Sequence, residues 1–306
     1  IMAWWQQIRR SLLVHSFLQD PLAVGSAVVL LLLLVVSGGA PWFAPYNPYD
    51  PSTIDIMDSE IPPLWMSGGD ARFLLGTDTQ GRDMLSTIFY GMRVSLTIGI
   101  GAVALQAVLG ILVGMTAGYF GKKLDAFLMR LTDVQLSFST YMVAIFFGAI
   151  FQSAFGMGTY ERLAIPLLIV IIGVAEWPQY ARTVRASVLA EKKKEYVEAA
   201  RVAGLSTTRI MWRHILPNTM TPVLVISTVQ VANAIMSEAA LSFIGLGMPV
   251  TRPSLGSLIK AGFDYIFSGS WWITLFPGIA LVVLILAINL LGDWLRDYLN
   301  PKIYKG

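Results

Sequence analysis

Five long stretches of the chain carry no charged residue. They are Pro21–Tyr49, Val94–Gly121, Val134–Tyr160, Ile215–Ser237 and Tyr265–Gly292. Each is longer than the roughly 20 residues that an α-helix needs to cross a bilayer. A sixth apolar stretch, Leu163–Ala175, continues through Glu176 toward Arg182. The pattern predicts an all-α membrane protein with six transmembrane helices in one domain, because the sequence lacks the alternating ten-residue segments of a transmembrane barrel.

The composition agrees with this prediction and argues against several kinds of site. Only 13% of the 306 residues are charged and 55% are hydrophobic, whereas about 25% of a soluble protein is charged. The chain has no cysteine and two histidines, so we expect no disulfide, no bound metal and no cysteine nucleophile. Its net charge of +3 is assigned to cytoplasmic loops and not to a nucleic-acid partner.

The basic residues fall in alternate connections between the predicted helices. These residues are Arg9, Arg10, Lys122, Lys123, Lys192, Lys193, Lys194, Arg201, Arg209, Arg213, Arg296, Lys302 and Lys305. The connection Pro45–Met92 is acidic instead. Because basic connections mark the cytoplasmic side of a membrane, we expect both termini in the cytoplasm of a bacterial cell and Pro45–Met92 outside, in a multi-pass protein of the inner membrane.

This topology divides the chain into five parts. Residues 1–21 form a cytoplasmic segment, 22–44 the first transmembrane helix, 45–92 an acidic external loop, 93–298 a five-helix core and 299–306 a cytoplasmic tail. The external loop is expected to end in an elbow helix at the membrane interface, capped by Asp83. The N-terminal residues also partly imitate a secretory signal, but an uncleaved anchor is favoured because the apolar character continues through Phe43.

One polar segment, 191–217, separates the fourth and fifth predicted helices. Glu191 to Ala203 are mostly good helix formers, and Gly204 follows where a glycine commonly ends a helix. Ser206 is placed to cap a second short helix, Thr207 to His214. We expect Val197, Ala200, Ile210 and Trp212 to pack, and Glu198, Arg201 and Arg213 to face outward. An amphipathic connector that lies on lipid headgroups has the same composition.

The spacing within this segment is more specific than its composition. Glu198-Ala199-Ala200 is followed by three residues, Gly204, nine residues and a block ending in Leu216-Pro217. This spacing resembles the EAA signature of ABC-transporter permease subunits, although His214 stands where that family usually has isoleucine. In the family, this segment is a coupling helix that docks in a cleft of the ATP-binding subunit.

Three further stretches resemble the C-type permeases of the peptide and nickel uptake branch. They are "LLGTDTQGRDMLSTIFYGMRVSL" (Leu74 to Leu96), "SEAALSFIGLGMPVTRPSLGSLI" (Ser237 to Ile259) and "NLLGDWLRDYLNPK" (Asn289 to Lys302). The resemblance implies a type I ABC importer permease fold with short cytoplasmic coupling helices. It also implies four kinds of partner: a second homologous permease, two ATP-binding subunits, an external substrate-binding protein and the lipid bilayer.

The resemblance assigns roles to residues of the coupling segment. The implied contacts to the ATP-binding subunit are Glu198, Ala199, Ala200, Arg201, Gly204 and Leu205. As a hypothesis, Glu198 makes a charge-assisted contact and Gly204 sets the turn, so that Glu198→Lys or Gly204→Asp abolishes transport. ATP and Mg²⁺ are expected in the partner subunits, because this chain has no P-loop: in "GMTAGYFGKKL", Thr116 and Lys123 break the pattern.

Polar residues within the spans are candidates for the translocation path. They are Glu176, Gln230, Asn233 and Glu238. A carboxylate as deep in a span as Glu176 is expected to face protein or water, either in the path or as a structural partner of a neighbouring helix. Glu238 is expected at the outer membrane interface. Gln230 and Asn233 either line a path or form bonds between helices.

Several readings stay open at this point. A self-sufficient secondary transporter explains six spans and Glu176 but not the EAA spacing. An intramembrane enzyme is not favoured, because no HExxH or GxSxG motif occurs and we identify no catalytic residue. A scaffold is a third class. Within the importer branch, dipeptides, oligopeptides, glutathione and nickel chelates are all substrates, and we favour di- or short peptides. The external loop either meets a binding protein or packs over the bundle.

Overall fold

The computed structural model describes residues 12–50, 52, 54–249 and 251–299. Most of the predicted tail, 299–306, and the first half of the predicted N-terminal segment, including Arg9 and Arg10, lie outside these residues. The helices, in chain order, are α2 (Leu12–Gln19), α3 (Pro21–Gly38), α4 (Ala40–Phe43), η2 (Ile56–Asp58), α5 (Met84–Phe120), α6 (Lys122–Leu136), α7 (Thr140–Phe155), α8 (Met157–Glu191), α9 (Glu195–Val202), α10 (Thr207–Arg209), η3 (Ile210–Ile215), α11 (Leu216–Phe243), α12 (Leu255–Phe263), η4 (Ile266–Ser268) and α13 (Trp272–Tyr298).

The predicted set of six spans is confirmed, with a change in the third. In the described part of the chain, five continuous helices are long and apolar enough to cross a membrane, and α10, η3 and α11 count together as one of them. The sixth is the pair α6 and α7, which is bent by 83°. The predicted third span, Val134–Tyr160, therefore contains a break, and the fourth begins at Met157 and not at Leu163.

The break between α6 and α7 has a local cause. The Ser137 hydroxyl donates a hydrogen bond to the Val134 carbonyl at 2.6 Å, and the Ser137 backbone N–H ends α6 by donating to Asp133 and Val134. A serine side chain that bonds to nearby backbone offers the chain an alternative to continuing the helix. No glycine or proline marks this point, so hydropathy alone predicts an unbroken span.

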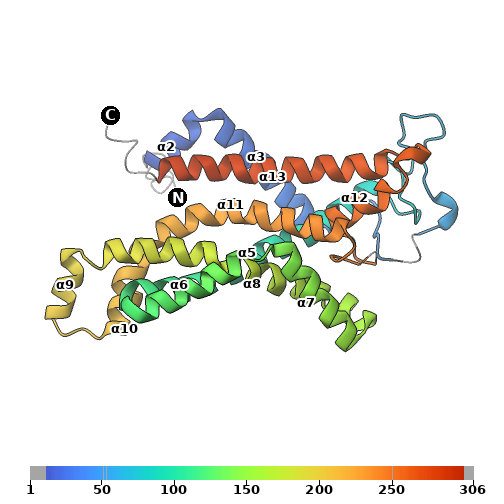
Figure 1. Cartoon of the computed structure of the whole chain (residues 1–306). Helices are drawn as coiled ribbons and strands as arrows, with labels where there is room; N and C mark the ends of the chain where they lie inside the picture. Colours follow the sequence, from blue (N-terminus) through green and yellow to red (C-terminus); the bar gives the residue numbers. More distant parts are fainter. Residues whose placement is uncertain (1–11, 51, 53, 250, 300–306) are drawn as a thin grey trace.

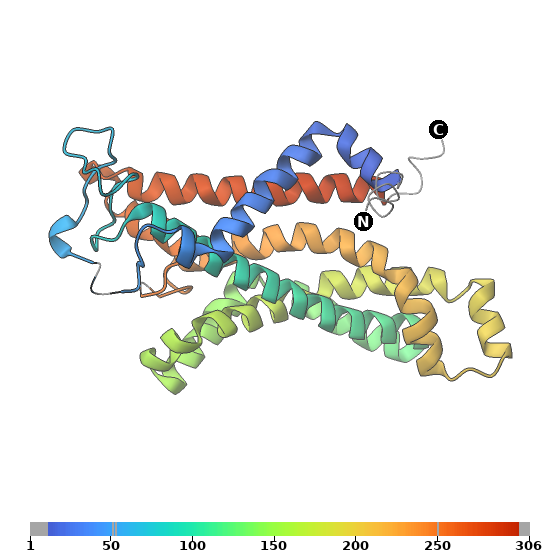
Figure 2. The same cartoon turned by 180° about the vertical axis from the view of Figure 1, so that it is seen from behind.

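Helices α5 and α8 lie side by side at the centre of the bundle (Figures 1 and 2). Gly110, Gly114 and Gly118 repeat at intervals of four residues on α5 and allow α8 to approach closely, as small residues do in many membrane bundles. One buried apolar cluster joins α5 and α8 to α11, and a second joins the start of α5 to α11, α12 and α13.

The first turns of α5 differ from the predicted interfacial elbow. The Asp83 side chain accepts a hydrogen bond from the Ser86 backbone N–H at 2.8 Å, which confirms the predicted cap. The helix then runs to Phe120 without a break, so no separate elbow forms. The reason is burial: Met84 and Ile88 belong to the cluster that holds α12 and α13, and this part of α5 is core.

The predicted external loop packs over one end of the bundle. Arg82 and Asp78 form a buried ion pair at 2.6 Å within it. The Trp272 indole N–H donates to the Thr77 carbonyl at 3.1 Å, which ties the loop to the start of α13. The opposite end of the bundle carries α9, α2 and the last turns of α13 (Figure 1).

Candidate functional site

The turn after α9 forms as its sequence predicts. Gly204 adopts a φ of 76°, in the left-handed region that glycine accepts at low cost. Its N–H donates to the Arg201 carbonyl and the Leu205 N–H donates to the Ala200 carbonyl, at 3.0 and 3.1 Å. Ser206 then caps α10 through the Arg209 N–H. The predicted roles of Gly204 in the turn and of Ser206 as a cap are confirmed.

The boundaries of the two short helices differ from the prediction. The helix predicted from Glu191 is interrupted after the end of α8, and α9 begins at Glu195. The second helix, predicted to end at His214, instead passes through the π-helical turn η3 into α11. Pro217 lies in the first turn of α11, where its missing N–H costs little.

The buried and exposed faces of the segment match the prediction except at one residue. Val197, Ala200 and Ile210 are buried, and Glu198, Arg201 and Arg213 are exposed. Trp212 is 43% exposed, so its predicted packing is wrong. Its neighbours Met211 and Ile215 are buried instead.

The outward face of α9 mixes apolar surface with charge. Ala199 and Val202 are exposed, and Val202 is 89% accessible. Glu198 forms an ion pair with Arg201 at 2.8 Å, in which both side chains remain exposed. An exposed ion pair of this kind contributes little to the stability of a helix. Glu198 and Arg201 can therefore exchange this contact for one with a partner protein at little cost. The face also projects beyond the rest of the bundle (Figure 1).

Tyr196 joins α9 to the two long helices on either side, a connection that the sequence pattern does not reveal. Its hydroxyl donates to the Glu191 carboxylate at 2.7 Å, at the end of α8. The Asn218 amide donates to the same hydroxyl at 3.2 Å and to the His214 carbonyl at 2.7 Å. Burial, together with the bond to Glu191, raises the pKa of Tyr196 to about 12, so the phenol stays protonated at neutral pH.

Three of the four candidate path residues lie in one hydrogen-bonded network of side chains, which is buried except at the exposed Asn233. The Gln106 amide donates to the Glu176 carboxylate at 3.3 Å, and Ser237 donates to the same carboxylate at 3.1 Å. The Gln230 amide donates to Gln106 at 3.3 Å, and Asn233 donates to Gln230 at 2.9 Å. This network of side chains joins α8, α5 and α11. Gln106 and Ser237 were not among the predicted residues.

The hydrogen-bonded network reaches a cavity of about 470 Å³ between α8, α11 and α13. Gln230 and Asn233 line this cavity, together with Gln179, Thr183, Thr221 and Arg296. Hydroxyl and amide groups that face an open space in a bundle suit a passage for a polar solute. The path role of Glu176, Gln230 and Asn233 stays a prediction.

Glu238 does not join this group, and it is buried among helices and not exposed at the surface of the bundle. Its side chain is fully buried and accepts hydrogen bonds from the Ser95 hydroxyl at 2.8 Å and the Ser242 hydroxyl at 2.6 Å. Ser95 also accepts a bond from the Leu255 N–H, at the start of α12. Glu238 therefore fastens α5, α11 and α12 together.

Glu238→Ala is expected to lower the thermal stability of the purified protein. The change leaves two buried serine hydroxyls without their acceptor, and each unsatisfied group costs about 1–3 kcal/mol. We expect a clear fall in the midpoint of thermal unfolding in detergent, and only a small one for Asp264→Ala, which changes an exposed carboxylate near the end of α12. Equal midpoints for the two variants contradict the role of Glu238 in stabilising the contacts between α5, α11 and α12.

Comparison with known proteins decides the family. Residues 110–305 match the family described as the binding-protein-dependent transport system inner membrane component. The chain belongs to this family. Residues 4–63 of the permease also match the N-terminal transmembrane domain of oligopeptide transport permease C.

Curated relatives of the permease align over most of its length. The di/tripeptide transport system permease protein DppC of Pseudomonas aeruginosa is 38% identical over 94% of this chain and 91% of its own. The dipeptide transport system permease protein DppC of Escherichia coli is 37% identical over 94% and 92%. A chain of the MetNI methionine ABC transporter in an inward-facing conformation is 19% identical, with a TM-score of 0.56 over 71% of this chain and 98% of that one. The last comparison supports a type I ABC importer permease fold.

Proposed function

We propose that this permease is one half of the translocation pathway of an ATP-driven importer of di- or short peptides. Relatives with peptide-transport names and the matched family support transport of this class. The second homologous permease, two ATP-binding subunits and an external binding protein complete the complex. ATP and Mg²⁺ bind in the ATP-binding subunits. Nickel chelates and glutathione are the alternative substrates within the same kind of complex.

The observation that carries this proposal is the shape of the α9 segment. A short helix held between two long helices moves as a rigid body, and its outward face presents Ala199, Val202 and Glu198. When ATP closes the partner subunits, a docked α9 is displaced and carries the ends of α8 and α11 with it. Two global states with a site open to one side in each are what transport requires.

The proposed orientation follows from the same segment. If α9 meets ATP-binding subunits, its end of the bundle faces the cytoplasm. The last turns of α13 and the helix α2 lie at that end, and the acidic loop lies at the other (Figures 1 and 2). Both termini are then cytoplasmic, in agreement with the positions of the basic residues.

The complex reconstituted in proteoliposomes tests this function. With ATP at the coupling-segment side and loaded binding protein at the other, labelled dialanine is expected to enter, and omission of the permease abolishes uptake. Uptake by the permease alone, driven by an ion gradient and indifferent to ATP, contradicts the proposal and supports a secondary transporter. Entry of glutathione or a nickel chelate in place of dialanine keeps the complex and changes the substrate.

Tyr196→Phe is expected to uncouple ATP hydrolysis from transport. The change removes the hydroxyl that links α9 to Glu191 and Asn218, so movement of α9 reaches α8 and α11 less completely. Since a hydrogen bond to a charged acceptor contributes about 1.5–3 kcal/mol, we expect uptake per ATP hydrolysed to fall about tenfold. Tyr141→Phe, at an exposed ring on α7, is the control. An unchanged uptake per ATP hydrolysed in Tyr196→Phe contradicts the proposed role of Tyr196 in linking α9 to α8 and α11.

A further inference from the structure

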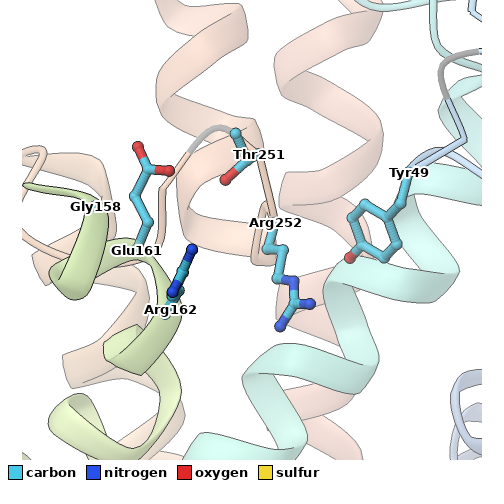
Figure 3. Close-up of a pocket in the computed structure, with 6 residues that line it drawn as sticks. All are labelled: Tyr49, Gly158, Glu161, Arg162, Thr251 and Arg252. Atoms are coloured by element: carbon cyan, nitrogen blue, oxygen red, sulfur yellow. The ribbon is translucent and has the colours of Figure 1, made fainter.

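Two adjoining cavities open at the end of the bundle opposite α9. One, of about 600 Å³, is lined by Tyr49, Gly158, Glu161, Arg162, Thr251 and Arg252. The other, of about 430 Å³, is lined by Tyr49, Tyr90, Arg93, Val94, Thr97, Ile165 and Arg252. Tyr49 and Arg252 belong to both, and Figure 3 shows Arg252 between Arg162 and Tyr49. The first volume is in the range of small-molecule sites.

Three arginines from three different elements converge on these cavities. Arg93 comes from α5, Arg162 from α8 and Arg252 from the connection between α11 and α12. All three are exposed, and within the described residues none of them forms an ion pair. Glu161 contributes one negative charge to the lining. Unpaired positive charges in a concavity concentrate the field there and attract anions.

The remaining lining narrows the chemistry of the ligand. Tyr49 and Tyr90 pack edge to face with ring centroids 5.1 Å apart, and phenols add neutral donors beside the arginines. Burial raises the pKa of Tyr49, although the charges of Arg82, Arg252 and Arg93 act against it. Val94 and Ile165 add apolar surface. A guanidinium binds a carboxylate through two parallel hydrogen bonds, so the site suits a small carboxylate with a partly apolar body.

We propose that the two cavities form an entry site for the C-terminal carboxylate of the transported peptide, with Arg252 as its central ligand. This proposal rests on the proposed function as a peptide importer. The peptide leaves the external binding protein, and its carboxylate is held by Arg252 with Arg93 or Arg162 until the pathway opens. Acidic side chains of the external binding protein also carry carboxylates that Arg252 could bind. The experiment below separates a carboxylate of the peptide from one of the binding protein.

Arg252→Gln in the reconstituted complex is the test, with uptake of labelled dialanine measured against the concentration of loaded binding protein. If Arg252 holds the peptide, the maximal rate falls about tenfold and the half-saturating concentration of binding protein is unchanged. Arg252→Lys keeps the charge and is expected to recover part of the rate. Arg72→Gln, at an external arginine already paired with Asp58 and Asp70, is expected to transport normally.

Two outcomes overturn the entry site. An increased half-saturating concentration of binding protein with an unchanged maximal rate means that Arg252 contacts the binding protein and not the peptide. Wild-type values for both quantities mean that Arg252 has no role in uptake. If the complex with Arg252→Gln does not assemble, a variant that carries both Arg93→Gln and Arg162→Gln is judged by the same criteria. Stimulation of ATP hydrolysis by the binding protein is expected to persist in each variant. Failure of the unmodified complex to import dialanine refutes the peptide substrate of the proposed function instead.

Discussion

Glu198→Lys is expected to abolish ATP-driven uptake without removing the permease from the membrane. Glu198 is exposed, and its partner in this chain is Arg201, which is also exposed, so the fold depends little on Glu198. At an interface, loss of one partner of a buried charged contact costs about 2–5 kcal/mol, and a reversed charge adds repulsion. Uptake and co-purification of the ATP-binding subunits are the measurements.

The control for Glu198→Lys is Asp264→Lys, the same reversal at an exposed residue near the opposite end of the bundle. The structure gives a weaker reason for damage by Gly204→Asp, which the sequence pattern predicts to be as damaging, because this change acts only through strain in the backbone of the turn. A Cβ at Gly204 meets no atom within 4 Å, and aspartate tolerates the left-handed region better than most residues. Wild-type uptake by Glu198→Lys at normal expression contradicts the docking role.

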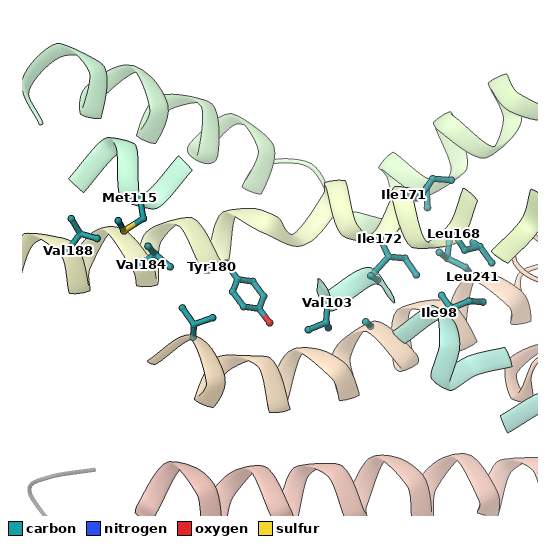
Figure 4. Close-up of a cluster of buried hydrophobic side chains, with 14 of the residues drawn as sticks. Ile98, Val103, Met115, Leu168, Ile171, Ile172, Tyr180, Val184, Val188 and Leu241 are labelled. Atoms are coloured by element: carbon teal, nitrogen blue, oxygen red, sulfur yellow. The ribbon is translucent and has the colours of Figure 1, made fainter. Parts of the chain in front are cut away.

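Gly114→Leu is expected to prevent accumulation of folded permease. A Cβ on Gly114 lies 2.5 Å from the Ala181 carbonyl oxygen and 2.8 Å from the Val184 Cβ, so α5 and α8 must separate along their central contact. Figure 4 shows Val184 and Val188 of α8 beside Met115 in the buried cluster at this contact. Overpacking of a tight core costs about 1–3 kcal/mol and sometimes more.

Gly25→Leu is the matched control for Gly114→Leu. Gly25 lies in α3, is exposed, and has no atom within 4 Å of a Cβ, so the same added side chain meets lipid. Membrane content and the elution profile of the purified protein report the outcome. Equal amounts of folded protein for both variants contradict the importance of the α5–α8 contact.

The sequence was sufficient where a local rule decides the structure. Asp83 and Ser206 cap helices because a short polar side chain can satisfy free N–H groups, and Gly204 ends α9 because it accepts a positive φ. The six apolar spans follow from their length, whichever helices surround them. These features need no knowledge of the tertiary fold.

Tertiary contacts determined what the sequence did not predict. Glu238 lies near the outer end of its span in sequence, but α12 folds back over it and supplies a buried setting with Ser95 and Ser242. Trp212 is exposed, and Met211 and Ile215 contribute to the buried cluster in its place. Gln106 joins the Glu176 group through a contact 70 residues apart. The sequence does show that Gln106 and Ser95 are polar residues inside an apolar helix. Helical periodicity and hydropathy do not show which residues of other helices they contact.

The most direct test of the account is whether α9 contacts an ATP-binding subunit. The chain contains no cysteine, so Val202→Cys, at a side chain that is 89% exposed, accepts a single photoactivatable cross-linker. Phe267→Cys, at a residue 95% exposed near the opposite end, is the control. We predict that the label at residue 202 cross-links to an ATP-binding subunit, with a yield that changes on addition of ATP, and that the label at 267 does not. Labelling of lipid alone from residue 202, in a complex that contains the ATP-binding subunits, contradicts the account.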